Sequence, residues 1–121
     1  MTLHMSAAEF DHAVDDAMAS IPEDLLKQLD NVAVLIQDEP DADMPGAPHL
    51  LGLYVGVPLT QRSSGYGFGN LPDRIYIFKG PLSRQAHNRT ELLRQIRVTV
   101  VHEIGHYFGI DDARLHELGW G

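Results

Sequence analysis

Two histidines and a glutamate near the end of the chain have the residue types and the spacing of a metal centre. His102, Glu103 and His106 stand in the stretch VHEIGHYFGIDD. Residues four apart on a helix lie one above the other, about 5–6 Å between Cβ atoms, so two imidazoles can converge on one ion. Glu103 is turned about 100° from His102 and stands beside such an ion. The spacing therefore predicts a metal-activated water with a carboxylate as its general base.

A third ligand is expected just beyond the end of this helix. Gly109 suits the left-handed position that ends a helix, and it lets the chain turn back toward the same ion. Asp112 follows six residues after His106 and is the best-placed carboxylate. Asp111 is expected to orient an imidazole or to cap the tail in preference to binding the ion, and His116 is expected to be a hydrogen-bond partner of a ligand, a surface side chain or an additional ligand. A fourth protein ligand at His116 would close the site and make it structural.

The helix that carries these residues is predicted from its signals at both ends. Asn88 with Glu91 three residues later forms a capping-box pattern, and Gly109 follows the other end. Between them lie about 20 residues, or about 30 Å of helix. One side is apolar and should face a sheet: Leu93, Ile96, Val100, Ile104 and Tyr107. The other side carries Gln95, Thr99, His102 and His106, with Glu103 at its margin, and should face a cleft.

The rest of the chain predicts helices and strands that cover this apolar side. Ser6 and Glu9 form a capping box before a helix over residues 7–20, and Pro22 opens a short helix that runs through Leu29. Three apolar stretches predict strands over residues 31–37, 50–57 and 74–79. The sequence shows no repeat and no linker. We therefore expect a single α+β domain over residues 1–121, with a mixed sheet of about three strands packed against helices.

Composition excludes several classes of function. The 121 residues include no cysteine, so a metal site must use imidazole and carboxylate. Residues 1–48 hold eleven acidic side chains and one lysine, for a charge of −10, and residues 49–121 carry +2. This imbalance argues against nucleic acid as a partner, because phosphate binding needs a concentrated basic face. Neither a signal peptide nor an apolar run of bilayer length is visible, so a cytoplasmic protein without membrane contact is expected.

The motif resembles a known family of metallopeptidases. The run HEIGHYFGIDD is similar to the zincins whose pattern is HExxHxxGxxD, and its continuation DDARLHELGW resembles the small single-domain mini-zincins. The stretches LLGLYVGVPLT and LPDRIYIFKGP also resemble their middle strands, so the likeness runs from Leu50 onward. The resemblance implies one Zn²⁺ per chain, held by His102, His106 and Asp112. It also implies Glu103 as the general base of a peptidase, an endopeptidase in preference to an exopeptidase.

The expected mechanism leaves two points open. The developing oxyanion needs a donor besides the metal, and three side chains qualify: Tyr66, Tyr107 and Arg114. The substrate is expected to be a peptide or protein in extended form, paired with the edge of the strand Arg74–Lys79. Nothing in the sequence indicates the oligomeric state or the cleavage specificity.

Two interpretations without catalysis remain beside the peptidase. The second subdomain of larger zincins has no counterpart here, which suits a zinc-stabilised module that binds a partner protein and includes His116 in a closed ligand shell. The other is an interaction domain that holds no metal.

Overall fold

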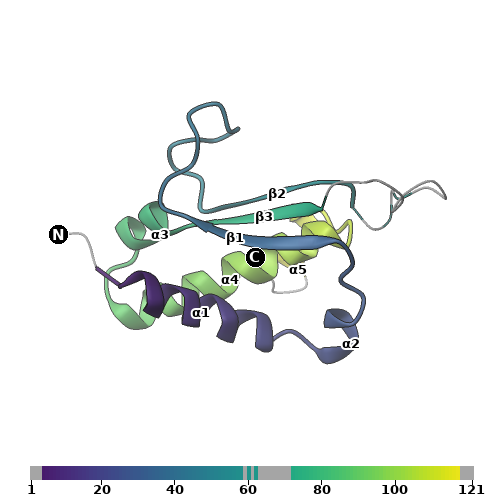
Figure 1. The fold of residues 1–121 in the computed structure, drawn as a ribbon, viewed down its shortest axis with the longest axis horizontal. Helices are drawn as coiled ribbons and strands as arrows, with labels where there is room; N and C mark the ends of the chain where they lie inside the picture. Colours follow the sequence, from purple (N-terminus) through teal and green to yellow (C-terminus); the bar gives the residue numbers. More distant parts are fainter. Residues whose placement is uncertain (1–3, 59, 61, 63–71, 118–121) are drawn as a thin grey trace.

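The computed structural model describes residues 4–58, 60, 62 and 72–117, with the backbone alone at Asp112 and Leu115. The elements run in the order α1, α2, β1, β2, β3, α3, α4, α5. This is the expected α+β architecture (Figure 1). Within the described residues, no helix is long and apolar enough to cross a bilayer. The cytoplasmic location stays a prediction.

The first two helices form where the sequence signals place them. Helix α1 spans Ala7–Ala19, and its capping box is complete, because Ser6 accepts from the Glu9 amide and Glu9 accepts from the Ser6 amide. Its buried face is made of small and aromatic side chains: Phe10, Ala13, Val14 and Ala17. Helix α2 spans Glu23–Leu26 after Pro22. It ends before Leu29, so the predicted short helix was three residues too long.

The three strands form one mixed sheet in the order β1-β3-β2. Strand β1 spans Val32–Gln37 and runs parallel to β3, which spans Asp73–Phe78. Strand β2 spans Gly52–Val55 and pairs with β3 in the antiparallel direction. Both edges of β3 are thus occupied. The prediction that this strand pairs with a peptide was wrong, because a central strand has no unpaired edge to offer.

Two helices of the structure were not predicted. Helix α3 spans Lys79–Gln85 directly after β3 and buries Pro81, Leu82 and Ser83. Its Gly-Pro pair is a weak helix signal, although proline is tolerated in a first helical turn, where its missing N–H is not needed. Helix α5 spans Asp112–Glu117. It is short, and the sequence had predicted only a tail here.

The long helix α4 spans Arg89–Tyr107, 19 residues. Asn88 caps it by accepting from the Glu91 amide at 2.8 Å. At the other end Gly109 has φ +81°, its amide donates to His106 O, and the Ile110 amide donates to Gly105 O. This pair of bonds satisfies carbonyls that would otherwise lack partners at a helix end. The glycine predicted to end the helix does so.

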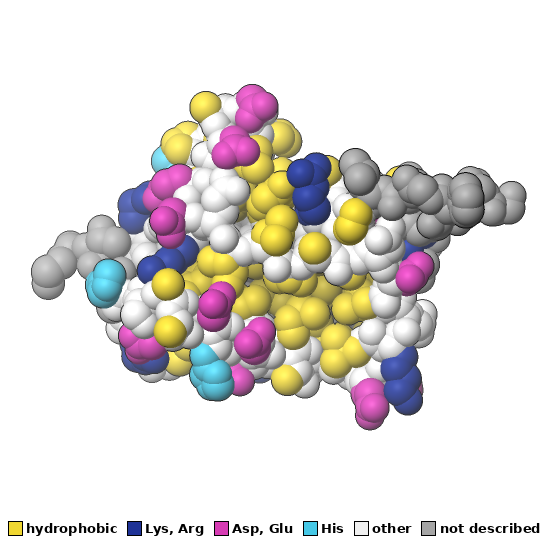
Figure 2. All heavy atoms as spheres, in the orientation of Figure 1, with side chains coloured by type: hydrophobic (Ala, Val, Ile, Leu, Met, Phe, Trp, Pro, Cys, Tyr) yellow, Lys and Arg dark blue, Asp and Glu magenta, His cyan; other side chains and the backbone are white. Residues whose placement is uncertain are grey.

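Helix α4 packs its apolar side into the core beneath the sheet, together with α1 (Figure 1). One residue of the predicted apolar side was wrong, because Leu93 is 41% exposed and its neighbour Leu92 is fully buried. The side chains of α4 that join the core cluster are Leu92, Ile96, Val100 and Ile104. On the face drawn in Figure 2, hydrophobic side chains gather across the middle, and most of the acidic ones lie around them.

Strand β2 approaches α4 closely at Gly52. A Cβ added to this glycine would lie 2.7 Å from Cγ2 of Thr99 and 3.2 Å from Cγ of Glu103, both on α4. Real carbon atoms do not approach to 2.7 Å, so only glycine permits this separation of strand and helix. The absence of a side chain at Gly52 therefore allows β2 to lie this close to the side of α4 that carries Glu103.

We predict that Gly52→Ala destabilises the fold by about 1–3 kcal/mol, the usual cost of overpacking. The added methyl group must push either Thr99 or the strand away. Urea denaturation measures the change in the free energy of unfolding. The matched variant is Gly52→Ala with Thr99→Ser, which removes Cγ2 and should recover more than half of the loss. A double variant as unstable as Gly52→Ala alone would contradict this account of the contact.

Candidate metal centre

His102 and His106 lie one turn apart near the C-terminal end of α4. Their ring centroids are 4.6 Å apart and the ring planes are nearly perpendicular, at 78°. Both residues are half-buried. The rings therefore face a shared space at the surface of the helix, where an ion can reach them without opening the core.

Glu103 completes a compact group of three side chains. Each of His102, Glu103 and His106 offers a ligand atom within 4.8 Å of the others. Glu103 is only 7% exposed, and its Oε1 lies 3.0 Å from Nδ1 of His106. When Nδ1 carries the proton and donates to Glu103, the lone pair of Nε2 can serve a metal. In that tautomer Nε2, and not Nδ1, would be the ligand atom of His106.

A groove runs between this group and strand β2. Its walls come from the start of β2 with the residue before it and from α4: Leu51, Gly52, Val98, Thr99, His102 and Glu103. Glu103 borders the groove beside Gly52, where the absence of a side chain brings the strand close. A ligand lying along β2 would therefore pass directly over the carboxylate and the first histidine.

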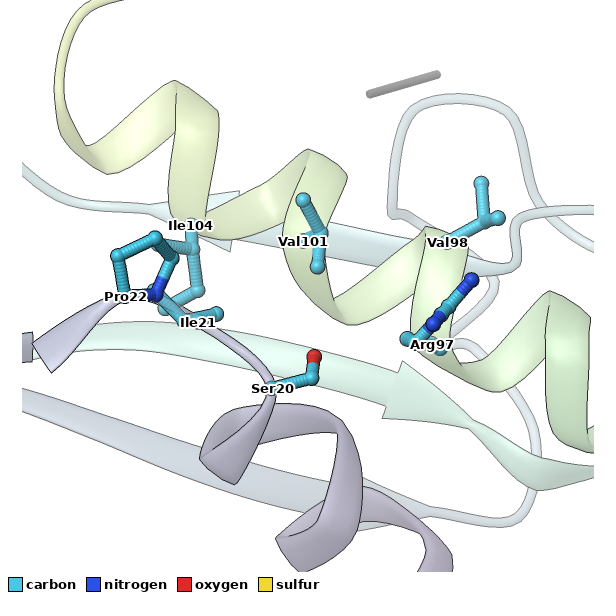
Figure 3. Close-up of a pocket in the computed structure, with 7 residues that line it drawn as sticks. All are labelled: Ser20, Ile21, Pro22, Arg97, Val98, Val101 and Ile104. Carbon is cyan, nitrogen blue, oxygen red and sulfur yellow. The ribbon is translucent and has the colours of Figure 1, made fainter. Parts of the chain in front are cut away.

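A second groove lies on the other side of Val98, between α4 and the corner where α1 meets α2 (Figure 3). One side of this groove is lined by Ile21 and Pro22, and the other side is lined by residues of α4 that include Arg97, Val98 and Val101. None of the three potential ligands lines this groove. His102 and Glu103 line the groove beside β2 instead, and the two hollows share only Val98 among their described lining residues.

The donor set suits zinc. Two imidazoles and a carboxylate are nitrogen and oxygen donors of the kind that Zn²⁺ takes, and the chain has no cysteine thiolate to add. The side chain of Asp112 lies outside what the structure describes, but its backbone begins α5, three residues after the left-handed Gly109. The described residues are thus compatible with a metal ion that has two histidine ligands on one helix.

The structure places the other predicted supporting residues on or beside α5. Asp111 Oδ1 accepts from the Arg114 amide at 2.8 Å, which caps this helix. The Arg114 guanidinium pairs with Glu117, and His116 is exposed. The structure therefore does not bring Asp111 or His116 into the described group of ligand atoms.

Of the three predicted oxyanion donors, Tyr107 lies in the core. It is fully buried, and its hydroxyl accepts from the Asp30 amide at 2.8 Å and lies within hydrogen-bond distance of the Gln28 and Asp30 carbonyls. These bonds join α4 to the segment that leads into β1. Tyr66 lies outside the described residues, and Arg114 is exposed on α5.

A buried polar cluster beside the site was not predicted from the sequence. Asp73, at the start of β3, is 2% exposed and accepts from the Tyr54 hydroxyl, from Arg62 and from the Val57 amide. Burial, followed by the hydrogen bond to Asp73, raises the pKa of Tyr54 well above its usual value. The only available signal was an acidic residue opening an apolar strand, which is more often a turn residue.

Comparison with known proteins agrees with this geometry. The chain matches the family model described as zincin-like metallopeptidase over residues 29–120. Its fold is similar to the solved structure of a conserved hypothetical protein from Thermus thermophilus, with a TM-score of 0.57 and 23% sequence identity over 94% of this chain and 97% of that chain. A search of curated proteins finds no significant match. The family match covers most of the chain and includes the histidine–glutamate–histidine group, and the chain therefore belongs to the zincin-like metallopeptidases.

Proposed function

We propose that this protein is a zinc-dependent peptidase that hydrolyses peptide bonds in extended substrates. The observation that carries the proposal is the group on α4, where two imidazoles and a buried carboxylate offer ligand atoms within 4.8 Å of one another. A structural role alone would not require a carboxylate beside the two imidazoles at the edge of an accessible groove. Membership of the zincin-like family supports the same reaction.

Three side chains are proposed to hold the zinc: His102, His106 and Asp112. Two neutral imidazoles and one carboxylate leave the ion with a formal charge of +1 and an open position, which is the catalytic type of zinc site. When bound there, zinc supplies Lewis-acid chemistry, polarising a carbonyl and lowering the pKa of a water to about 7. The Nδ1 bond from His106 to Glu103 orients this ring before any ion arrives.

Glu103 is proposed as the general base. Its carboxylate would take a proton from the attacking water and then deliver it to the leaving amine nitrogen. The residue is 7% exposed and lines the groove, so it reaches a substrate while most bulk water is kept away. One of its oxygens engages His106, and a carboxylate still has further lone pairs to accept that proton.

Strand β2 is proposed to bind the substrate. Among the described residues β2 pairs with β3 along one edge, and its Gly52 lines the groove with α4, so the other edge of β2 is the proposed docking edge. A peptide added there gains backbone hydrogen bonds irrespective of its side chains. This replaces β3 as the proposed docking strand and puts the scissile bond beside Glu103. A peptide or protein substrate, without nucleic acid or membrane, remains the proposed partner.

Two candidates remain as the proposed oxyanion donor: Arg114, which is exposed on α5, and Tyr66, which lies outside the described residues. Tyr107 is set aside because its hydroxyl already bonds to backbone groups of residues 28–30.

We predict that Glu103→Gln lowers kcat/KM for peptide hydrolysis by about 10²–10⁴-fold, the usual worth of a general base. The amide cannot take the proton, but it has nearly the same shape, so zinc content should stay at one ion per chain. Peptide-library digestion and metal analysis measure the two effects. Glu91→Gln, on the same helix but three turns away, serves as the control and should hydrolyse normally. Undiminished cleavage by Glu103→Gln would exclude the proposed role.

We also predict that zinc raises the melting temperature and that His106→Ala abolishes the rise. An ion that binds only the folded state stabilises it by about 2.7 kcal/mol at a concentration one hundred times its Kd. The matched variant is His116→Ala on the exposed side of α5, which should keep the full response. Loss of the response in His116→Ala would instead support the closed ligand shell of a non-catalytic module.

Tyr107→Phe should separate stability from catalysis. Loss of the hydroxyl leaves the Asp30 amide without its partner, so the free energy of unfolding should fall by about 1–3 kcal/mol. The value of kcat should change less than twofold. Tyr76→Phe, whose hydroxyl accepts from the Arg74 side chain at the surface, provides the stability control. A large loss of kcat in Tyr107→Phe would return this residue to the oxyanion candidates.

A further inference from the structure

A buried ion pair between Arg62 and Asp73 contacts the last residue of α4, Tyr107, and plays no part in the proposed reaction. Arg62 donates to Asp73 Oδ2 at 2.8 Å, and the two side chains are only 7% and 3% exposed. Removing two charges from water costs several kcal/mol, and their attraction often fails to repay it. Such a pair is weak evidence for stability alone. The other contacts of Arg62 indicate which parts of the chain the pair holds in place.

Arg62 joins three separate parts of the chain. Its Nε donates to the Val57 carbonyl and its Nη1 to the Asp30 carbonyl, while its guanidinium lies 4.9 Å from the centroid of the Tyr107 ring. The fixed fork of an arginine can serve all these partners at once, which the single ammonium of a lysine cannot. Arg62 thus binds the segment that leaves β2 to both β3 and the last turn of α4.

This segment also touches the turn that follows the histidines. Thr60 packs directly on Gly109, so closely that a Cβ on this glycine would lie 3.0 Å from Cγ2 of Thr60 and still closer to its hydroxyl. Gly109 has φ +81° and directs the chain from His106 toward Asp112. The contact fixes one side of this turn, whose other side is fixed by hydrogen bonds to the end of α4.

We propose that Arg62 is a positioning residue of the metal centre, acting through Thr60 and Gly109 to hold the turn that presents Asp112. The proposal rests on the proposed zinc site with Asp112 as its third ligand. In this proposal Arg62 acts through its protein contacts and is not itself a ligand of the zinc. Its anchor at Asp73 would keep Arg62 against Tyr107 and Thr60 against Gly109, and this would keep the third ligand at a fixed distance from the two histidines.

The test measures zinc affinity by competition with a chromophoric chelator. Arg62→Lys keeps the charge but loses the fork, and it should weaken zinc binding about tenfold, the lower end of the range for groups that orient ligands. Thr60→Ala changes an exposed residue and leaves the buried pair intact, so it should fold normally and weaken zinc binding in the same direction. Far-ultraviolet circular dichroism checks the fold of each metal-free variant.

Two controls separate positioning from general stability. Arg84→Lys disrupts another arginine fork, the one that joins α3 to Glu39, and should leave zinc affinity unchanged. Tyr54→Phe removes a different hydrogen bond to Asp73 while leaving Arg62 in place. It should lower the melting temperature without weakening zinc binding.

A double-mutant cycle with Asp112→Asn decides whether the effect passes through the third ligand. If it does, Arg62→Lys costs about tenfold in the parent chain and less than twofold in the Asp112→Asn background. The proposal would be overturned if Arg62→Lys lowered zinc affinity equally in both backgrounds. It would also be overturned if the zinc affinities of all variants followed their melting temperatures. Neither result would contradict the proposed peptidase activity. A parent chain that binds no zinc would overturn both proposals.

Discussion

Helix α4 must bury one side in the core and present the adjacent side to a ligand, and most other features of the structure serve this double role. Ile104 is buried against the core two residues after His102, and Glu103 lies between them at the boundary. The core therefore fixes the direction of the histidines, because close packing allows the helix only one rotation about its axis.

The position of the sheet relative to α4 determines the width of the groove. Strand β2 approaches α4 as closely as it does because Gly52 has no side chain to separate them. The same strand is tied at Tyr54 to Asp73, and Asp73 is tied through Arg62 to the end of α4. Strand and helix are thus connected at two places along the groove, by a close contact and by a polar bridge. On the side of the strand, neither connection involves a residue with a proposed catalytic role.

The local part of this arrangement could be predicted from the sequence. Helix α4, its Asn88 cap and its end at Gly109 follow from signals within a few residues, and the spacing of the histidines follows from the helix itself. Helix α3 could not be predicted in this way, because the Gly-Pro pair in its first turn is more typical of a turn than of a helix. Leu93 was assigned to the buried side because it groups with Ile96 and Val100 at about 100° per residue, but in the structure Leu92 is the leucine that is buried there.

The long-range part was beyond the sequence for a physical reason. The central place of β3 in the sheet depends on which strands pair. Alternation of apolar and polar side chains indicates which face of a strand is buried, but it does not indicate which strand lies beside it. The partner of the Tyr107 hydroxyl lies 77 residues earlier, and the partner of Arg62 lies 11 residues later across a connection. Arginine and aspartate are common surface residues, so nothing in their types marks them as a buried pair. These contacts become visible only when the chain is folded.

The double role of α4 also limits how the chain can change in length during evolution. Inserting or deleting one residue between Leu92 and His102 would turn the histidines by about 100° relative to the core, and the groove would lose its ligands. An insertion of about seven residues, two turns of helix, restores the direction to within about 20° but shifts the site by about 10 Å along the axis. Relatives that keep the site should therefore differ in length elsewhere, as in the connections that flank β2, where added residues leave the helix undisturbed.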